Sequence, residues 1–446
     1  MFKHDYIKDK NFLLLFFGTL VSNTGSRMYG FAISLFLLDT TGLATSMSTY
    51  ISIWTFTMFV VAPVAATFTD RWRRKVRVLY MTDFGRGLVY GLIGIGVYYF
   101  DRQGNTAMVL TTIYTLLTLV AIQSAFFSPA SSALLPQVVH ADELVSASSL
   151  FQMTRSAINV LGLMFGAVLY VELGIVVLIA LNAISFILSG ISEMFIRFDV
   201  AKNQERLDAS AYNDHDVVHH RNRFLHFVKR VYFDLKEAAV YIFKEAKPIA
   251  AIVFIIVLSL TLVEPWFSVG VPYLIKQYLS FARFGADYIL ASIKFAEAAG
   301  MILMSFIVAF IAAKFTIHQL FKFGAACYVV IAILYVTLVA AFDGAYISEI
   351  TFLAIFITVN FIAGLVSASF NAPLNAAISK YIDPNKLGKV VTMMDSFGGI
   401  LMPFSILIAG LVIDHLSLYY VAASMVVGII LMTFIIFRNQ YIRELK

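Results

Sequence analysis

Long apolar runs separated by short polar segments dominate the chain. An apolar run of about 18 or more residues is typical of a helix that crosses a membrane. The pattern predicts twelve such helices, at 12–38, 46–69, 78–100, 107–130, 146–171, 174–197, 249–274, 286–312, 318–341, 350–379, 390–413 and 417–437. At about 20 residues per helix, they take up just over half of the length, which predicts an all-α membrane protein. The first run is interpreted as a retained helix rather than a signal peptide, because it is long and no small-residue cleavage site follows it.

A polar segment at 199–248 divides this pattern into two halves, 1–198 and 249–446, with six predicted helices each. The stretch 127–144 in the first half aligns without gaps to 370–387 in the second half. Both stretches lie at the end of the fourth predicted helix of their half. Equal halves with a weak internal repeat are typical of transporters built from a duplicated bundle. The sequence therefore predicts two pseudo-symmetric six-helix bundles joined by a cytoplasmic linker.

The linker has a pattern of its own. Between Phe224 and Ile242, apolar residues recur at helical spacing, with lysines and arginines between them. This pattern predicts a basic amphipathic helix, which suits either the inner membrane surface or a position packed beneath the bundle. Four of the eight histidines lie in the linker, at positions 215, 219, 220 and 226. Their surroundings favour a solvated loop over a metal site, because no cysteine or carboxylate pattern accompanies them.

Basic residues are distributed unequally between the two sides of the predicted membrane. The side that carries both ends of the chain holds 26 of the 33 lysines and arginines, whereas the opposite side holds only Arg102, Lys276 and Arg283. Because cytoplasmic loops carry the excess of basic residues, both termini are predicted to lie in the cytoplasm. The same bias accounts for the net charge of +6, so we expect no nucleic-acid partner.

Composition narrows the classes of protein further. Only 13% of the residues are charged, against about 25% in soluble domains. A single cysteine, Cys327, excludes a disulfide framework and a cysteine-rich metal site. The one Gly-Lys pair, at 388–389, is followed by valine, so the sequence lacks the phosphate-binding loop of ATP-driven pumps, and it also lacks H-E-x-x-H and G-x-S-x-G. We therefore expect no cofactor, no bound metal and no enzymatic activity.

The second predicted helix ends in the sequence Ala66-Thr-Phe-Thr-Asp70-Arg71-Trp-Arg-Arg74-Lys. A carboxylate directly before a basic turn can cap a helix start or hold an arginine across a seam between bundles. This stretch resembles motif A of the major facilitator superfamily, G-x-x-x-D-R-x-x-R-[RK], with alanine in place of the leading glycine. The resemblance implies that Asp70, Arg71 and Arg74 belong to a cytoplasmic gate that alternates between two states.

Further stretches extend the resemblance over nearly the whole chain outside the linker. Asp83-Phe-Gly-Arg86 is similar to the D-x-x-R that follows motif A. The turn with Pro129 and Pro136, and its counterpart around Gly388, resemble one branch of the superfamily, the drug–proton antiporters that include macrolide-efflux and siderophore-export proteins. The resemblance implies the major facilitator fold in a bacterial cell membrane, with transport by alternating access.

One motif typical of exporters is incomplete. Exporters of the superfamily usually carry motif C, G-x-x-x-G-P-x-x-G-G, in the fifth helix. Gly162 and Gly166 keep the first glycine pair, whereas the proline and the second glycine doublet are missing. The two glycines still allow a neighbouring helix to approach closely, but the motif lends export less support than a complete one would.

Charged residues inside predicted membrane helices are costly in lipid and are therefore candidates for function. Arg27 and Glu264 lie near the middle of the first and seventh helices, which are equivalent in a duplicated bundle. By resemblance both helices line a central cavity, so the two side chains are predicted to face each other at mid-depth. Glu264 would then bind and release a proton as the cargo displaces Arg27. The alternative is a static ion pair.

Other charged residues fall into two groups. Lys294 and Glu297 lie three residues apart in the eighth helix and share one face. They are predicted either to satisfy one another or to make Glu297 a second proton site. Arg86, Arg155 and Asp395 lie toward the cytoplasmic ends of the third, fifth and eleventh helices, where we expect them to snorkel or to pair at the gate.

Polar and aromatic residues within the helices are candidates for a cavity wall. They are Asn23, Trp54, Asn159, Trp266 and Asn360. A wide cavity with few polar groups suits amphipathic or lipophilic cargo better than a sugar. Asp39 and Glu172 lie at the outer ends of helices, where we expect them to be solvated.

These features predict a secondary active transporter, acting as a monomer, that exports lipophilic or amphipathic small molecules in exchange for protons. Its partners would be the cargo, protons and membrane lipids. One alternative keeps the fold with another cargo, such as a lysolipid, a siderophore or an imported nutrient. A second is a transport-inactive membrane sensor that signals through the linker. A third, an integral-membrane enzyme, lacks a His/Asp cluster at a membrane face.

Overall fold

A computed structural model gives the arrangement of the helices. The structure describes residues 5–72, 75–139, 143–197, 247–279, 285–311, 315–382 and 387–443, with Val240 and Ile242 in addition. The predicted amphipathic helix, apart from those two residues, the histidine-rich loop and Arg74 lie outside the described residues. At Asp70, Arg71 and Asp395 the structure describes the helical backbone and not the side chain.

The first half of the chain forms long helices. After a short η1 (Asp5–Lys8) come α1 (Lys10–Thr41), α2 (Ala44–Arg71), α3 (Lys75–Arg102), α4 (Thr106–Val138) and α5 (Leu144–Met194). Helix α5 consists of two rods, because Gly174 interrupts it with φ 75° and ψ 164°. Glycine adopts this left-handed conformation without the steric cost that a side chain would add. The two rods are the fifth and sixth predicted helices.

The second half contains α8 (Lys247–Leu258), η4 (Ser259–Val263), η5 (Trp266–Gly270), α9 (Val271–Tyr278), α10 (Ala286–Ile311), α11 (Ile317–Asp343), α12 (Glu349–Tyr381), α13 (Leu387–His415), α14 (Leu418–Arg438) and α15 (Gln440–Arg443). The predicted seventh helix is the continuous segment from α8 to α9. Its η4 and η5 are π-helical turns that flank Glu264 and Pro265. Proline lacks the N–H that an α-helix uses, and π turns inside helices often mark functional sites.

Several helices begin at side chains that accept hydrogen bonds from the first turn, as expected for helix caps. The Asp9 carboxylate accepts from the backbone N–H groups of Asn11 and Phe12 at 2.8 and 3.0 Å. Thr316 forms a complete capping box at the start of α11, and Ser348 caps α12. The local sequence therefore fixes where these rods begin.

The rods match the prediction of twelve membrane-length helices, six in each half, when α5 counts as two and the segment from α8 to α9 as one. Eight segments of the described part of the chain are both long and apolar enough to cross a membrane. Helix α1 is not among them, because a polar stretch around Arg27 lowers its mean hydropathy. The all-α membrane fold is confirmed.

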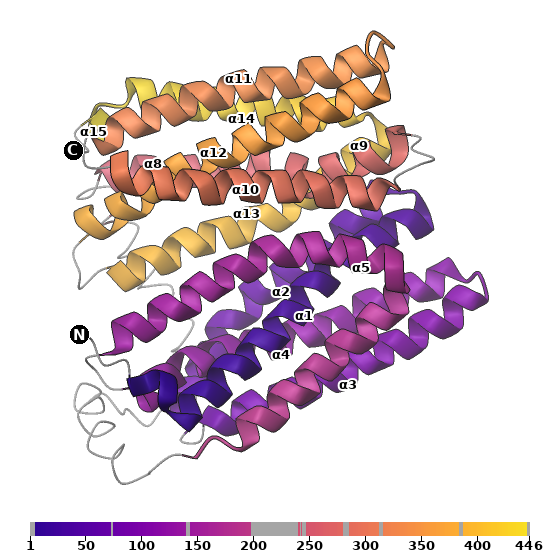
Figure 1. The fold of residues 1–446 in the computed structure, drawn as a ribbon, viewed down its shortest axis with the longest axis vertical. Coiled ribbons are helices and arrows are strands. Elements are labelled where there is room, and N and C mark those ends of the chain that lie inside the picture. Colours follow the sequence, from indigo (N-terminus) through magenta and orange to yellow (C-terminus); the bar gives the residue numbers. More distant parts are fainter. Residues whose placement is uncertain are drawn as a thin grey trace.

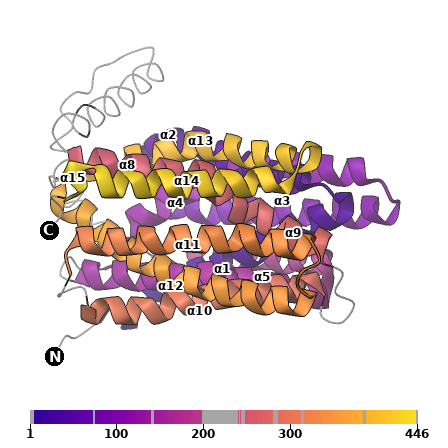
Figure 2. The ribbon, with the colours of Figure 1, turned by 90° about the horizontal axis from the view of Figure 1, so that it is seen from above.

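Figure 1 shows helices α1–α5 grouped in the lower part of the molecule and α8–α14 in the upper part. The two groups meet where α2 packs on α13 and α5 packs on α10 (Figures 1 and 2). Helix α1 begins and α15 ends at one end of the bundle, on the left of Figure 1, which we call the termini end. The opposite end, with the turns at Gly42 and Gly174, is the far end. The domain boundaries in the linker lie outside the described residues and stay a prediction.

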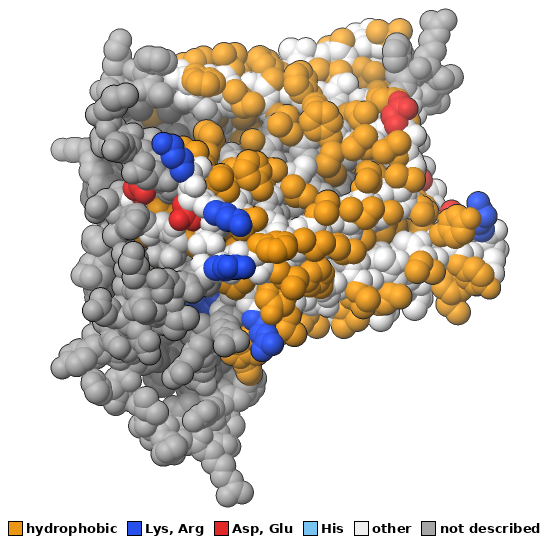
Figure 3. Space-filling view, turned by 60° about the horizontal axis from the view of Figure 1, so that its bottom comes forward, with side chains coloured by type: hydrophobic (Ala, Val, Ile, Leu, Met, Phe, Trp, Pro, Cys, Tyr) orange, Lys and Arg blue, Asp and Glu red, His pale blue; other side chains and the backbone are white. Residues whose placement is uncertain are grey.

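The outer surface is apolar along much of its length. Figure 3 shows hydrophobic side chains across the middle of one face, with Lys and Arg side chains toward the termini end and at the far tip. Large exposed hydrophobic residues include Leu88, Ile95, Phe306, Ile350 and Phe434. A contiguous apolar surface of this extent would be unfavourable in water and suits contact with lipid.

Candidate functional site

A cavity of about 1230 Å³ lies between the two groups of helices. One wall is formed by α1, α2, α3, α4 and α5, which we call the N-terminal wall. The other, the C-terminal wall, is formed by α8, η4, η5, α10, α11, α12 and α14, with Glu264 between the two π turns. Both halves of the chain therefore contribute to one site.

The four residues predicted to couple protons or to bind cargo all line this cavity. They are Arg27 on the N-terminal wall, and Glu264, Lys294 and Glu297 on the C-terminal wall. Two predicted gate residues, Arg86 and Arg155, and two predicted lining residues, Asn23 and Trp54, also reach it. The duplicated architecture brings these residues together from helices far apart in the sequence.

Arg27 is held at the wall by close packing of α1 on α5. A Cβ atom at Gly162 would lie 2.7 Å from Cβ of Arg27, and one at Gly166 would lie 2.5 Å from the carbonyl oxygen of Met28. The two glycines therefore let the helix backbones approach, as small residues do in membrane proteins. The charge that acts on Arg27 is the guanidinium of Arg155. Among the described residues, no carboxylate lies within 4 Å of either arginine.

The C-terminal wall carries a second group of charges. Nζ of Lys294 lies 3.0 Å from Oε2 of Glu297, so these two residues pair on one face of α10, as one of the two predictions had it. Glu264 interacts electrostatically with both of them. The Ser268 hydroxyl donates a 2.6 Å hydrogen bond to the backbone carbonyl of Glu264, one turn earlier in the helix.

Arg27 and Glu264 line the cavity from opposite walls, and whether they pair is a question that the sequence leaves open. Both side chains line the cavity, yet the described residues contain no ion pair between them within 4 Å. Each interacts with a charge on its own wall. Arg27 interacts with the like charge of Arg155, and Glu264 with the opposite charge of Lys294. The two residues therefore lie on opposite sides of the cavity, one in each half of the duplicated fold.

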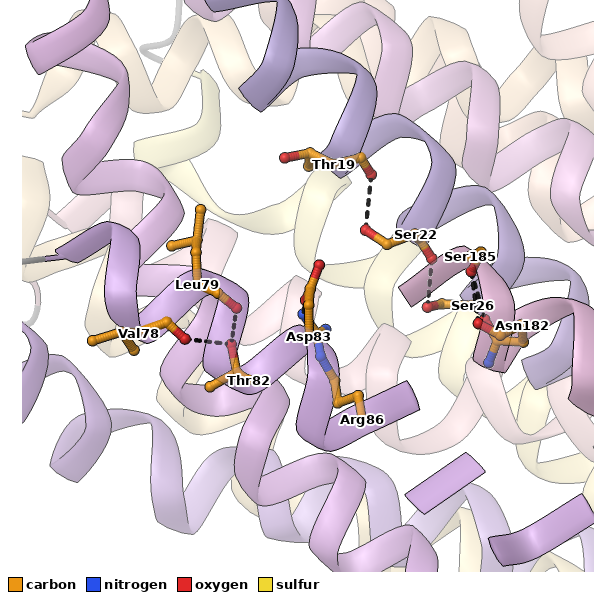
Figure 4. Close-up of polar contacts among 10 residues, drawn as sticks. All are labelled: Thr19, Ser22, Ser26, Val78, Leu79, Thr82, Asp83, Arg86, Asn182 and Ser185. Atoms are coloured by element: carbon orange, nitrogen blue, oxygen red, sulfur yellow. Dashed lines mark hydrogen bonds and ion pairs between the residues drawn. The ribbon is translucent and has the colours of Figure 1, made fainter. Parts of the chain in front are cut away.

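A buried cluster behind the N-terminal wall was missed in part by sequence reasoning. Asp83 and Arg86 form an ion pair on one face of α3 (Figure 4). Glu193 of α5 interacts electrostatically with both, and its exposed fraction is 0%, like that of Asp83. Ser189 is the hydroxyl that acts on the Glu193 carboxylate, and among the described residues neither carboxylate oxygen has a hydrogen bond of ordinary geometry. Glu193 lies near the end of a predicted helix, where a carboxylate is easily taken for a solvated residue.

The aromatic neighbours of Arg86 complete this cluster. Its guanidinium carbon lies 4.2 Å from the ring centre of Phe127 and 4.3 Å from that of Phe186. Stacking of this kind stabilises a desolvated guanidinium. Only the edge of Arg86 reaches the cavity, since the residue is 5% exposed.

Three of the predicted lining residues are wrong. Trp266 is fully buried in the hydrophobic core, with its ring 6.3 Å from Tyr335. Asn360 is also buried, and its side-chain amide donates a 2.8 Å hydrogen bond to the carbonyl of Phe356 within α12. Asn159 is exposed on α5, outside the set of residues that line the cavity. A single sequence does not reveal which face of a helix meets the cavity when every face is largely apolar.

The far end of the cavity is closed by contacts between the two groups of helices. Nζ of Lys276 lies 2.5 Å from Oδ2 of Asp39 and 2.6 Å from Oδ1 of Asp287. The Tyr170 hydroxyl donates to the same Asp39 oxygen at 2.9 Å. We call these four residues the far-end latch. Asp39 is exposed, as predicted, with 39% of its side chain accessible, and it also has these two partners, which the sequence did not predict.

Two further contacts join α2 to α13, one of them at the far end. The Asp414 carboxylate accepts hydrogen bonds at 2.8 Å from the backbone N–H groups of Ala44 and Thr45, at the start of α2. The Ser52 hydroxyl donates to the carbonyl oxygen of Pro403 at 2.7 Å. Tyr288 donates to Glu172 in the same region, so this carboxylate also has a partner. Toward the termini end, in contrast, the cavity continues and is lined by Phe16 and Leu135.

Comparisons with known proteins agree with this geometry. The family model of the Major Facilitator Superfamily matches residues 15–354. The chain is 31% identical over 191 residues to an uncharacterized MFS-type transporter, YkuC, of Bacillus subtilis (strain 168), and the match covers 42% of each chain. The chain therefore belongs to the major facilitator superfamily, and it is a membrane transporter rather than an enzyme.

Solved structures share the fold at low identity. A bacterial homologue of the iron transporter ferroportin in an inward-facing state is similar with a TM-score of 0.67 and 13% identity, covering 97% of this chain and 98% of that one. The nucleoside transporter NupG is similar with a TM-score of 0.66 and 10% identity, covering 98% of this chain and 100% of that one. These likenesses show the architecture over the whole described chain and leave the cargo open.

Proposed function

We propose that this protein is a proton-coupled secondary transporter that moves amphipathic or lipophilic small molecules out of the cell by alternating access. One observation carries the proposal: every charge predicted to couple protons or bind cargo lies on the wall of one cavity between the two bundles. Transporters of this architecture bind cargo at such a mid-membrane site and rock the bundles around it.

Glu264 is the proposed proton site. It lies beside Pro265 in a helix that two π turns distort, and it faces the cavity. A carboxylate on a cavity wall can exchange a proton with whichever side the cavity opens to. Lys294 and Glu297 already form a pair, so Glu264 is the carboxylate of this wall whose charge is least compensated. Glu297 is the second choice for the proton site.

The conformation described above supports alternating access. The far-end latch joins α1, α5, α9 and α10. If the termini end faces the cytoplasm, as the distribution of basic residues predicts, this is an inward-facing state. The latch would then open in the outward-facing state, while the motif A residues Asp70, Arg71 and Arg74 would close the termini end with Asp395.

The proposal is tested by accumulation of a neutral lipophilic dye, N-phenyl-1-naphthylamine, in a pump-deficient bacterial host. We expect lower accumulation in cells that express the protein, and loss of this difference with an uncoupler or in Glu264→Gln. Asp101→Asn, a carboxylate beyond the end of the cavity, is the matched control and should pump normally. Pumping that persists in Glu264→Gln and fails in Glu297→Gln would move the proton site to Glu297. Accumulation equal to that of empty cells in every strain would contradict export of lipophilic molecules.

Uptake by proton co-transport is a second candidate, and the unpaired arginines on the N-terminal wall favour it. An anionic cargo beside Arg27 and a negatively charged Glu264 repel one another, so binding of the anion and binding of the proton reinforce each other. Proteoliposomes that contain a pH-sensitive dye decide between the two directions. Cargo added outside would acidify the lumen in co-transport and would alkalinise it in exchange.

A further inference from the structure

Two arginines on the N-terminal wall stand apart from the other charges of the cavity. Arg86 is paired with Asp83, and Lys294 with Glu297. Arg27 and Arg155 both line the cavity and repel one another. Among the described residues, neither has a carboxylate within 4 Å. Within the part of the chain that the structure describes, the wall therefore presents two guanidinium groups without a compensating carboxylate.

Both arginines are exposed to the cavity, so a ligand can reach them. Their like charges repel, and charged side chains at membrane depth are normally paired. A ligand anion between the two arginines would turn repulsion into attraction. Guanidinium groups bind carboxylate and phosphate oxygens in a planar, bidentate manner, which makes these anions the best complement.

Neutral donors surround the two arginines. Hydroxyl and amide side chains of α4 and α5 line the same wall: Ser128, Ser131, Ser132, Ser148, Gln152 and Thr154. Hydroxyl and amide groups can donate hydrogen bonds to the oxygens of an anion without adding charge. The N-terminal wall thus offers a polar, positively charged surface.

The C-terminal wall carries an apolar patch beside its charged group of Glu264, Lys294 and Glu297. The patch includes Ile255, Leu260, Val263, Phe267, Ile429 and Met432. Hydrocarbon parts of a ligand gain about 25 cal/mol for each Å² that they bury against such surface. The same cavity therefore has a cationic, polar patch on one wall and an apolar patch on the other.

From this juxtaposition we infer that the cargo is an anionic amphiphile, a molecule with a carboxylate or phosphate-ester head and an apolar body. The head binds between Arg27 and Arg155, and the body lies against the C-terminal wall. This inference rests on the proposed function as a transporter and specifies the chemical class of its cargo. For such a cargo, binding of the anion and protonation of Glu264 would reinforce each other, which favours the second candidate above, uptake by proton co-transport, over exchange.

The test is binding to the full chain in nanodiscs of uncharged phosphatidylcholine, with radiolabelled hexyl phosphate as the probe. We expect saturable binding that unlabelled hexyl phosphate displaces. Hexyltrimethylammonium and inorganic phosphate should compete at least tenfold more weakly, because one lacks the anionic head and the other the apolar body. Equal competition by hexyltrimethylammonium would overturn the anionic head, and equal competition by inorganic phosphate would overturn the apolar body.

Substitutions locate the site. Arg27→Gln and Arg155→Gln should each weaken hexyl phosphate binding at least tenfold, and Arg27→Lys should weaken it less. Arg102→Gln is the matched control, because Arg102 stacks on Tyr98 at the far end and should bind normally. If Arg27→Gln fails to fold, Arg155→Gln carries the test, since Arg155 is exposed and its replacement leaves no buried partner behind. Unchanged binding in a folded Arg155→Gln protein would overturn the inference.

The two proposals fail in different experiments. The inference about the cargo is contradicted if hexyltrimethylammonium or inorganic phosphate competes as well as hexyl phosphate. The proposed function still stands in that case if dye pumping depends on Glu264 and on the proton gradient. Loss of the proposed function appears as the absence of proton-coupled movement of either the neutral dye or hexyl phosphate. Tight, Arg27-dependent binding of hexyl phosphate without any movement would uphold the anion site and contradict transport of this class of cargo.

Discussion

Two clusters of charge in the two halves of the molecule have the same composition and opposite surroundings. Asp83, Glu193 and Arg86 lie behind the N-terminal wall, and Glu264, Glu297 and Lys294 lie on the C-terminal wall. Each contains two carboxylates and one cation. The first is sealed, with exposed fractions of 0% for both carboxylates. In the second, the side chains of Lys294 and Glu297 are 14% and 29% exposed.

The comparison indicates that access to water determines whether a charged cluster in a membrane protein can exchange protons or bind ions. A sealed cluster cannot exchange protons or ions quickly, so its charges act mainly on the packing of α3 against α5. A cluster on a cavity wall is hydrated, and its charges can respond to cargo and to protons. The far-end latch is a third cluster with the same composition, Asp39, Asp287 and Lys276, and it lies where the two bundles meet.

The largest effect is expected from removing the cation of each membrane cluster. Arg86→Met leaves two buried carboxylates without a cation, and we expect it to lower the free energy of unfolding by about 3–5 kcal/mol, the usual result of breaking a buried pair. Lys294→Met should cost about 1 kcal/mol or less, because water in the cavity can hydrate the remaining carboxylates. Denaturation by SDS, followed by circular dichroism, measures both. Equal losses of unfolding free energy in the two variants would show that access to water does not distinguish the clusters.

In transport assays we expect the opposite order of effects, with the larger loss in the cluster on the cavity wall and the smaller loss in the sealed cluster. Glu264→Gln is expected to lower proton-driven transport at least tenfold, about 1.4 kcal/mol in the barrier, because it removes the proposed proton site. Glu193→Gln keeps the size of the side chain and removes a sealed charge that does not reach the cavity, so transport should stay within about a factor of two. Initial rates in proteoliposomes at matched protein density give the comparison. A greater loss in Glu193→Gln would make the sealed cluster part of the coupling machinery.

Removing the cation of the far-end latch tests a third situation, in which a charged cluster controls a conformational change. Lys276→Met leaves Asp39 and Asp287 facing one another, which should favour opening of the far end by about 1–2 kcal/mol. The change can be measured with a Cys327→Ser, Met47→Cys protein, because Met47 lines the cavity and is 1% exposed. Labelling by a membrane-impermeant maleimide from the far side should rise severalfold. Lys276→Arg is the control and should label as slowly as the parent.

The smallest effect is expected within the C-terminal cluster. A double-mutant cycle of Lys294→Met and Glu297→Gln should give a coupling energy of about 0.5–1 kcal/mol, as for partly exposed ion pairs. The pair joins residues three apart on one helix, so it organises a single surface rather than a contact between helices. A coupling energy above about 3 kcal/mol would place this pair in a sealed environment like that of Arg86.

Much of the site followed from sequence because charge inside an apolar helix is conspicuous. Arg27, Glu264, Lys294 and Glu297 were identified as membrane-buried charges, and all four line the cavity. Polar and aromatic lining residues were harder to predict. Trp266 and Asn360 turn into the helical core, since an amide or an indole ring is tolerated on several faces of a helix that is apolar all round.

Partners across helices could not be predicted in the same way. Glu193 and the far-end latch residues Asp39 and Lys276 sit near helix ends, where sequence alone favours solvation. Tertiary packing brings Glu193 beside Asp83 and Arg86, and brings Lys276 to Asp39 across 237 positions of the chain. Whether Arg27 and Glu264 pair could not be predicted for the same reason, because the distance across a cavity depends on how the two bundles pack.

The sequence by itself determined the twelve rods, their division into two sets of six and the identity of the charges at membrane depth. It could do so because hydropathy acts locally, residue by residue along each helix. Only the tertiary structure decided which of those charges share a cavity, which are sealed behind its wall and which remain without a partner. Electrostatic interactions depend on distance and on access to water, and both are properties of the packed bundles rather than of any one helix.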